Sequence, residues 1–186
     1  SVYFLYRIKN RVLVAGAVLV IGITLVHPFC SVIAMPNADF MGKTGNLTLD
    51  GMAWLKEQKP DEYEALCWLS MTADSGDVIL EAPGDAYTYS SRIPPFTGLP
   101  TVIGWRTHEI MWGREWPDVE QRCTDVDRIY TGDENTDALF EKYSVKYIYV
   151  GENERKKYGS KLDNLIQNDG IKLVFQTGTT KIYRVI

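Results

Sequence analysis

Acidic, basic and aromatic side chains gather in one central stretch of the sequence, beside two short apolar runs that are typical of strands. Glu81 follows directly after the run 78–80, and Trp105 comes shortly after the run 101–103. In open α/β sheets, ligands bind beyond the carboxyl ends of the strands, so both loops should open on the same edge. The residues that we expect to contact a ligand there are Glu81, Arg92, Trp105, His108, Glu109 and Arg114.

The residue types in this stretch suit an anionic or sugar-like ligand. Arginine makes bidentate contacts to phosphate or carboxylate groups, and Arg92, Arg106 and Arg114 could supply them. Trp105 and Trp112 could offer flat apolar surfaces to a sugar ring or a lipid head group. The two indoles could instead be packing residues, or could lie against a bilayer, because tryptophan favours the membrane interface.

His108 and Glu109 have the residue types of an acid/base pair. Side chains of adjacent residues usually diverge, however, so the two need not serve one reaction centre. The alternative is that both residues cap or pin a long surface loop. A self-contained external hydrolase that uses His108 and Glu109 is therefore the third hypothesis, behind ligand positioning and a non-catalytic interaction role.

Other patterns favour structural roles. The segment 150–155 is a strand–glycine–helix junction, and helix N-termini can bind anions, but Glu152 and Glu154 should satisfy that end internally. Cys67 and Cys123 could form one disulfide or remain two buried free thiols. The sequence has no pattern of a zinc site, a calcium loop, a phosphate-binding Gly-rich loop or a dinucleotide fingerprint. It assigns no metal, and any cofactor stays unknown.

The elements that would position these residues alternate between helices and short strands. Helices are expected near 49–58, 60–74, 118–128, 137–143, 152–158 and 161–167, and strands at 78–80, 101–103, 129–131, 145–150, 172–176 and 181–185. The last two strands flank a glycine-containing turn and form a hairpin. This alternation predicts an α/β fold with a mostly parallel sheet, covering helices and a C-terminal antiparallel hairpin.

An uncharged run over residues 12–35 precedes this domain. A helix needs about 20 apolar residues to cross a bilayer, and the run supplies them. Arg7, Lys9 and Arg11 stand just before it, so the positive-inside tendency predicts that residues 36–186 are extracytoplasmic. The acceptor pattern at 46–48 suits an external loop. A cleaved secretory signal is the alternative to a retained helix.

The apolar residues 2–6 read as the tail of an earlier membrane helix. The expected organisation is therefore the end of a preceding helix with a cytoplasmic turn (1–11), a transmembrane helix (12–35), a linker (36–48) and an extracytoplasmic α/β domain (49–186). The formal net charge of −4, without a basic face, argues against nucleic acid as a partner. The expected partners are the lipid bilayer and the upstream transmembrane helices of the parent protein.

Several blocks of sequence resemble one known family. They lie at 49–55, 79–82, 97–105 with His108 and Glu109, 142–143, 147–151 with Glu154 and Arg155, and 182–185. Together they resemble the C-terminal part of the YYY family of archaeal and bacterial polytopic membrane proteins, which is distantly similar to glycosyltransferases of the GT-C type.

The resemblance implies a partner and a role. Kinship with GT-C enzymes implies sugar transfer from a polyprenyl-phosphate donor on the outer face of the membrane, with the catalytic acids in the N-terminal membrane part. This chain would then be a domain that helps to position a lipid-linked sugar donor or acceptor, without the full catalytic site. The alternative is a non-catalytic interaction or assembly domain of a membrane protein complex.

Overall fold

The computed structural model of the chain describes residues 11–34 and 48–186, which belong to two compact units, Ser1–Trp54 and Leu55–Ile186. The predicted end of an earlier membrane helix, nearly all of the linker and the acceptor asparagine at position 46 lie outside the described residues. These three expectations stay predictions.

The first unit contains the long helix α2 (Arg11–Ala34). Its 21-residue segment Arg11–Ser31 is long and apolar enough to cross a membrane, and none of it is buried within the protein. Its large apolar side chains, among them Leu19, Leu25 and Phe29, are exposed. The predicted apolar N-terminal helix is therefore confirmed, and its composition and exposure are compatible with a membrane anchor.

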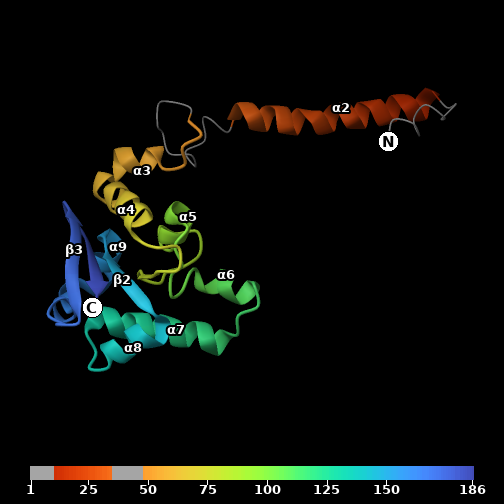
Figure 1. Cartoon of the computed structure of the whole chain (residues 1–186). Coiled ribbons are helices and arrows are strands. Elements are labelled where there is room, and N and C mark those ends of the chain that lie inside the picture. The colour runs from red at the N-terminus through yellow and green to blue at the C-terminus, as the bar shows by residue number, and fades with distance from the viewer. Residues whose placement is uncertain (1–10, 35–47) are drawn as a thin grey trace. The chain divides into compact units, whose positions relative to one another are not determined.

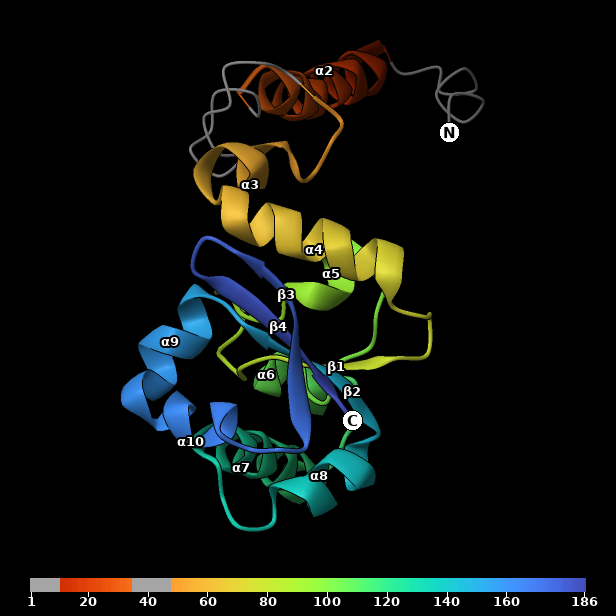
Figure 2. The same ribbon diagram turned by 60° about the vertical axis from the view of Figure 1, so that its left-hand side comes forward.

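The second unit is built on a four-stranded sheet with the order β1-β2-β4-β3 (Figures 1 and 2). The strands are β1 (Val78–Leu80), β2 (Val145–Val150), β3 (Ile171–Thr177) and β4 (Thr180–Val185). β1 pairs with β2 in parallel, whereas β2–β4 and β4–β3 are antiparallel. The α/β class and the C-terminal hairpin are thus confirmed.

The expectation of a mostly parallel sheet was wrong, because two of its predicted strands do not form. The 101–103 run makes only a single parallel bridge, from Thr101 to Ile79. Residues 129–131 lie inside helix α7 (Trp116–Thr131), where Ile129 continues a buried stripe with Val119 and Val126 at helical spacing. The remaining parallel contact is therefore β1 with β2, and the hairpin determines the character of the sheet.

Helices cover both faces of the sheet (Figure 2). On one face, α4 (Pro60–Thr72) packs on the hairpin, and its Trp68 stacks on Phe175 of β3 and meets Tyr147 of β2 edge-on. On the other face, α7 and α8 (Thr136–Tyr143) form a continuous buried core with Ile148 of β2. The other elements are α3 (Ala53–Gln58), α5 (Ile93–Thr97), α6 (Arg106–Met111), α9 (Glu152–Tyr158), η3 (Gly159–Lys161) and α10 (Leu162–Ile166).

The two cysteines of the domain are free thiols, which decides between the two alternatives left open by the sequence. Cys123 is buried on α7 and Cys67 is half-buried on α4. Burial raises the pKa of the Cys123 thiol, so it behaves as a small core residue.

One buried hydroxyl ties α7 to the two parallel strands. Tyr130 is fully buried, and its hydroxyl donates to the carbonyl oxygen of Tyr149 at 2.7 Å. The hydroxyl oxygen of Tyr130 also lies 3.0 Å from the carbonyl oxygen of Leu80. The bond fixes α7 at the carboxyl ends of β1 and β2, where the loops that carry the candidate site begin.

Replacing Tyr130 by phenylalanine should destabilise the domain, because the carbonyl groups of Leu80 and Tyr149 lose their contact with the buried hydroxyl. We expect Tyr130→Phe to lower the free energy of unfolding by about 1–3 kcal/mol in urea denaturation followed by circular dichroism. Tyr87→Phe, at an exposed tyrosine, should change it by less than about 0.5 kcal/mol. Equal effects of the two substitutions would contradict a bridging role for Tyr130.

Candidate functional site

The six residues predicted to contact a ligand fall into two neighbouring groups. Glu81 and Arg92 lie in a buried ionic network at the end of β1, whereas the other four, Trp105, His108, Glu109 and Arg114, lie on or beside the short helix α6. The two groups lie on the loops after β1 and after the 101–103 run. The sequence prediction did not separate the buried pair from the other four, of which Arg114 is exposed and Trp105, His108 and Glu109 are half-buried.

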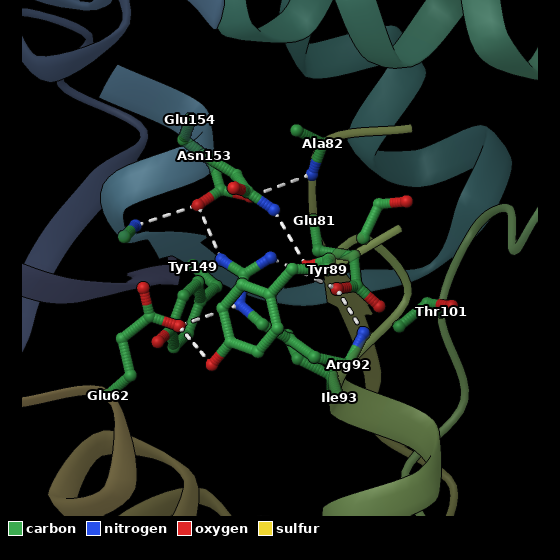
Figure 3. Close-up of polar contacts among 12 residues, drawn as sticks. Glu62, Glu81, Ala82, Tyr89, Arg92, Ile93, Thr101, Tyr149, Asn153 and Glu154 are labelled. Atoms are coloured by element: carbon green, nitrogen blue, oxygen red, sulfur yellow. Dashed lines mark hydrogen bonds and ion pairs between the residues drawn. The ribbon is translucent and has the colours of Figure 1, made fainter. Parts of the chain in front are cut away.

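Arg92 is the centre of the buried network, which we call the arginine–carboxylate cluster (Figure 3). The side chain is 2% exposed. Its Nη2 lies 2.7 Å from Oε2 of Glu154, its Nε lies 3.0 Å from Oε2 of Glu62, and its Nη1 lies 3.6 Å from Oε2 of Glu81. Three carboxyl groups from three parts of the chain therefore surround one guanidinium.

Glu154 connects the cluster to the backbone of two other elements. Its Oε2 accepts the N–H of Gly151 at 2.8 Å, and its Oε1 accepts the N–H of Ala82 at 3.0 Å. The first bond caps the N-terminus of α9, as expected from the strand–glycine–helix junction. The second holds the loop that leaves β1, so one carboxylate joins α9, that loop and Arg92.

Glycine at position 151 is required by the packing of this cluster. A Cβ atom there would lie 2.6 Å from the ring of Tyr149 and 3.0 Å from Nη2 of Arg92. Both neighbours are held on all sides, so neither can move away cheaply. The glycine therefore serves close approach of the backbone to the guanidinium.

Aromatic rings complete the environment of the guanidinium. Its carbon Cζ lies 4.7 Å from the ring centroid of Tyr149 and 5.4 Å from that of Tyr89. The hydroxyl of Tyr89 donates to Oε2 of Glu62 at 2.8 Å. These contacts suit a cation held out of water, because the ring faces carry partial negative charge.

Glu81 is the least compensated member of the cluster. It is buried, its Oε2 accepts the backbone N–H of Arg92 at 3.0 Å, and its Oε1 makes no hydrogen bond to any of the described residues. Burial raises the pKa of its carboxyl to about 7; attraction to Arg92 opposes this shift and repulsion from Glu154 adds to it. Glu81 thus changes its charge near neutral pH.

The loop between β1 and α5 connects the cluster to the surface. Its two ends, at Ala82 and Arg92, are held by the cluster carboxylates, and Asn153 Nδ2 donates to the carbonyl oxygen of Tyr89 at 2.8 Å. From the same loop, the carbonyl oxygen of Ser90 accepts the indole N–H of Trp105 at 2.8 Å. The buried cluster therefore positions the ring of Trp105.

Around Trp105 lies a set of rings that we call the aromatic surface, made of Tyr87, Trp105, His108 and Trp112. The imidazole of His108 is in the middle, with centroid distances of 5.0 Å to Trp105, 5.1 Å to Tyr87 and 5.9 Å to Trp112. Tyr87 is 85% exposed and Trp112 is 84% exposed. Tyr87 takes a positive φ of 61°, which an exposed tyrosine rarely adopts. Two of the four rings are thus presented to the outside.

Glu109 and Arg114 form a clamp at the edge of this surface. Glu109 Oε1 accepts the N–H of Gly104 at 3.0 Å, and its Oε2 lies 3.2 Å from Nη1 of Arg114. The carboxylate thus binds both ends of α6. This geometry matches the loop-pinning interpretation for Glu109, and its carboxylate makes no contact with His108 among the described residues.

The arrangement suits the binding of a ligand. Flat rings, an imidazole and a half-exposed guanidinium can contact a ring-shaped polar ligand and an anionic group. The described residues contain no group of three or more His, Cys, Asp or Glu side chains that could hold a metal ion.

Sequence reasoning missed two cluster members and one ring. Glu62 lies on α4, about thirty residues before Arg92 along the chain, and no local spacing relates the two. Glu154 was predicted to cap its own helix, which it does, but its contact with Arg92 is long-range. Tyr87 stood in the central polar stretch, and its positive φ carries no signal in the sequence.

No protein-family model and no curated protein sequence matches this chain. Among solved structures, the chain is similar to the C-terminal globular domain of an oligosaccharyltransferase from Archaeoglobus fulgidus. The identity is 15% and the TM-score 0.42, over 76% of this chain and 99% of that one. A TM-score of 0.42 supports no functional assignment, and the resemblance to the YYY family stays a prediction.

The raised pKa of Glu81 should make the stability of the domain depend on pH. The folded state binds a proton up to about pH 7, and the unfolded state releases it near pH 4.5. The stabilisation is complete below pH 4.5 and is lost as the pH rises to 7, a change of about 3 kcal/mol. Glu81→Gln should remove this slope in urea unfolding measured at several pH values.

Glu141→Gln, at an exposed carboxyl far along the chain, is the control for this experiment. It should keep the wild-type slope between pH 4.5 and 7. The titration assigned to Glu81 would be refuted by a Glu81→Gln variant whose stability follows the same pH profile as the wild type.

Replacing Arg92 should lower the free energy of unfolding far more than replacing Glu81. Arg92→Met leaves three buried carboxyl groups without their cation, and we expect a loss of about 3–5 kcal/mol. Arg114→Met removes the partner of a surface pair and should cost less than about 1 kcal/mol. If both variants unfolded at the same urea concentration, Arg92 would not hold the loop in place.

Proposed function

We propose that this chain is the extracytoplasmic C-terminal domain of a polytopic, GT-C-like membrane protein. In this proposal α2 is a transmembrane helix and residues 36–186 face the outside. The domain helps to position a lipid-linked sugar donor or acceptor and lacks the full catalytic site. If the parent protein is an enzyme, it is a membrane glycosyltransferase that uses a polyprenyl-phosphate sugar donor.

The observation that carries this proposal is the aromatic surface. Tyr87 and Trp112 present ring faces on which the apolar face of a sugar can stack, and His108 lies between them. The imidazole nitrogens of His108 make no hydrogen bond within residues 48–186 that would occupy them. They are therefore suited to a sugar hydroxyl or a phosphate oxygen.

Arg114 supplies the charge that a phosphate needs. Within the described part of the chain, its ion pair with Glu109 uses Nη1, and the side chain is 40% exposed, which leaves further N–H groups of the guanidinium accessible. A phosphate could accept from them in the bidentate manner that arginine favours. The proposed contacts to the ligand are thus Trp112, Tyr87, His108 and Arg114.

Glu81 and Arg92 keep a role in this proposal as positioning residues. Neither side chain is exposed to a ligand, since both are buried in the arginine–carboxylate cluster. Their contribution is to hold the loop that carries Tyr87 and accepts the indole N–H of Trp105. Trp105 and Glu109 act in the same way, one as the base of the ring stack and the other as the clamp of α6.

Binding of a polyprenyl phosphate and of its monosaccharide derivative to the full chain in lipid nanodiscs tests this role. Trp112→Ala should weaken binding of the sugar-bearing lipid about three- to tenfold, because one stacking contact is lost. Arg114→Ala should weaken binding of both lipids. Met71→Ala, at a comparably exposed apolar residue on α4, should leave both affinities unchanged. Unchanged affinity in both the Trp112 and Arg114 variants would refute the proposal.

A second candidate function is an assembly domain of a membrane protein complex. The exposed apolar side chains Met111 and Trp112 favour it, because large exposed apolar groups often mark interaction sites. Co-purification of the parent protein with a stable protein partner that Trp112→Ala releases, without any affinity for the lipid, would select this alternative.

A further inference from the structure

The largest apolar side chains of the domain that remain exposed are concentrated at the junction of α6 and α7. Met111 is 77% exposed, Trp112 84% and Trp116 54%, and α6 buries none of its residues. We call these three residues the α6–α7 tip. Other large apolar side chains exposed in the described part of the domain, such as Met71 on α4 and Leu173 on β3, lie on different elements.

The charged groups beside the tip are paired. Arg106 pairs with Glu120 and lies over the ring of Trp116, and Arg114 pairs with Glu109. The remaining neighbours in sequence are the acidic Glu115 and Asp118, exposed like the tip itself. The tip is therefore apolar with a neutral to acidic rim, which does not suit an anionic partner.

These residue types suit the interfacial layer of a neutral bilayer. Tryptophan is enriched where the hydrocarbon meets the head groups, because its ring is apolar and its N–H is polar. Methionine adds a flexible apolar side chain that adapts to an irregular surface. Trp105 is different, since its N–H is already bonded to the carbonyl oxygen of Ser90, so it stays with the domain.

The chain itself supplies a bilayer within reach. The segment that joins the end of α2 at Ala34 to the start of α3 at Ala53 can span at most about 65 Å when fully extended. If α2 is in the membrane, the tip is held at a high effective concentration next to the lipid surface. This step rests on the membrane-inserted α2 of the proposed function.

We infer that Met111, Trp112 and Trp116 insert into the interfacial layer of the bilayer that holds α2. The contact is apolar, so it does not require anionic lipids. It brings the neighbouring Tyr87 and His108 to the depth at which the head group of a lipid-linked sugar lies. The bilayer is thus the partner of the α6–α7 tip. Trp112 belongs to both the tip and the aromatic surface, so it lies where the lipid and the sugar-binding rings meet, and Tyr87 and His108 are left for the sugar.

Quenching of tryptophan fluorescence by brominated lipids tests the inference. The full chain is reconstituted into phosphatidylcholine vesicles that contain lipids brominated near the head-group end of the acyl chains and no polyprenyl phosphate. The wild type should be quenched, and the double variant Trp112→Phe, Trp116→Phe should lose at least half of the quenched signal. Trp68→Phe, at the half-buried indole that stacks on Phe175, should leave the lipid-dependent quenching in place.

A matched pair of methionines separates insertion from general effects of a new charge. Met111→Asp should reduce the quenching of the tryptophan fluorescence, whereas Met71→Asp, at a residue of 79% exposure on α4, should not. Raising the salt concentration to about 0.5 M should leave the wild-type signal unchanged, because screening acts on charges and not on apolar contact. Equal quenching in the wild type and the double variant, or equal effects of the two aspartates, would overturn the inference.

The inference and the proposed function can fail separately. Resistance of the chain to alkaline extraction reports the insertion of α2 in every variant. Quenching that persists while the sugar-bearing lipid fails to bind would refute the proposed function and leave the inference intact. Absent quenching in wild-type chain that resists extraction would refute the inference, whatever the outcome of the binding experiment.

Discussion

The charge of Arg92, held out of water among three carboxyl groups, is the interaction on which the rest of this domain depends. A guanidinium removed from solvent is costly unless its charge and its N–H groups are matched. Here the charge is balanced by Glu62 on α4, Glu81 at the end of β1 and Glu154 on α9, and Glu154 also accepts the hydrogen bond from Nη2. Each of those elements is thereby fixed relative to the other two.

The arginine–carboxylate cluster determines the shape of the loop between β1 and α5. The loop contains two non-glycine residues with positive φ, Tyr87 and Ser91, and it has little regular structure of its own. Its shape is imposed by carboxylates that bind its backbone N–H groups at Ala82 and Arg92. A rigid buried centre therefore supports a strained, exposed ring, which is typical of loops that carry function.

Local sequence patterns were sufficient to predict several of the helices and strands. The strand 145–150 and the helix 152–158 were predicted at the bounds at which they form, because periodicity and turn residues agree there. The 129–131 segment was misassigned, since a short run of β-branched and aromatic residues fits a strand as well as the last turn of a helix. The segment is recognised as helical only from the buried stripe of α7, which begins at Val119, and from Gly132, whose left-handed conformation ends the helix.

The candidate site was predictable in composition and only partly in arrangement. Polar and aromatic residue types indicated the loops after β1 and after the 101–103 run, but burial of Arg92 depends on Glu62, which lies on α4 and comes close only after the sheet and α4 have packed. No spacing rule reports such a contact. The mostly parallel sheet was wrong because the 101–103 and 129–131 segments form no strand of the sheet, and whether a short apolar run joins a sheet depends on pairing between distant segments.

The position of β4 in the sheet has a consequence for the order in which the domain can form. Residues 180–185 make the strand that lies between β2 and β3, so the sheet has a gap until that segment is available. A ribosome adds about 5–20 residues per second, so β1 and β2 wait for seconds before the strand that joins the hairpin to them emerges. During that time the hydrogen-bonding edge of β2 is open. Folding of this domain is therefore a late event in synthesis, and truncation before residue 180 removes a central strand of the sheet.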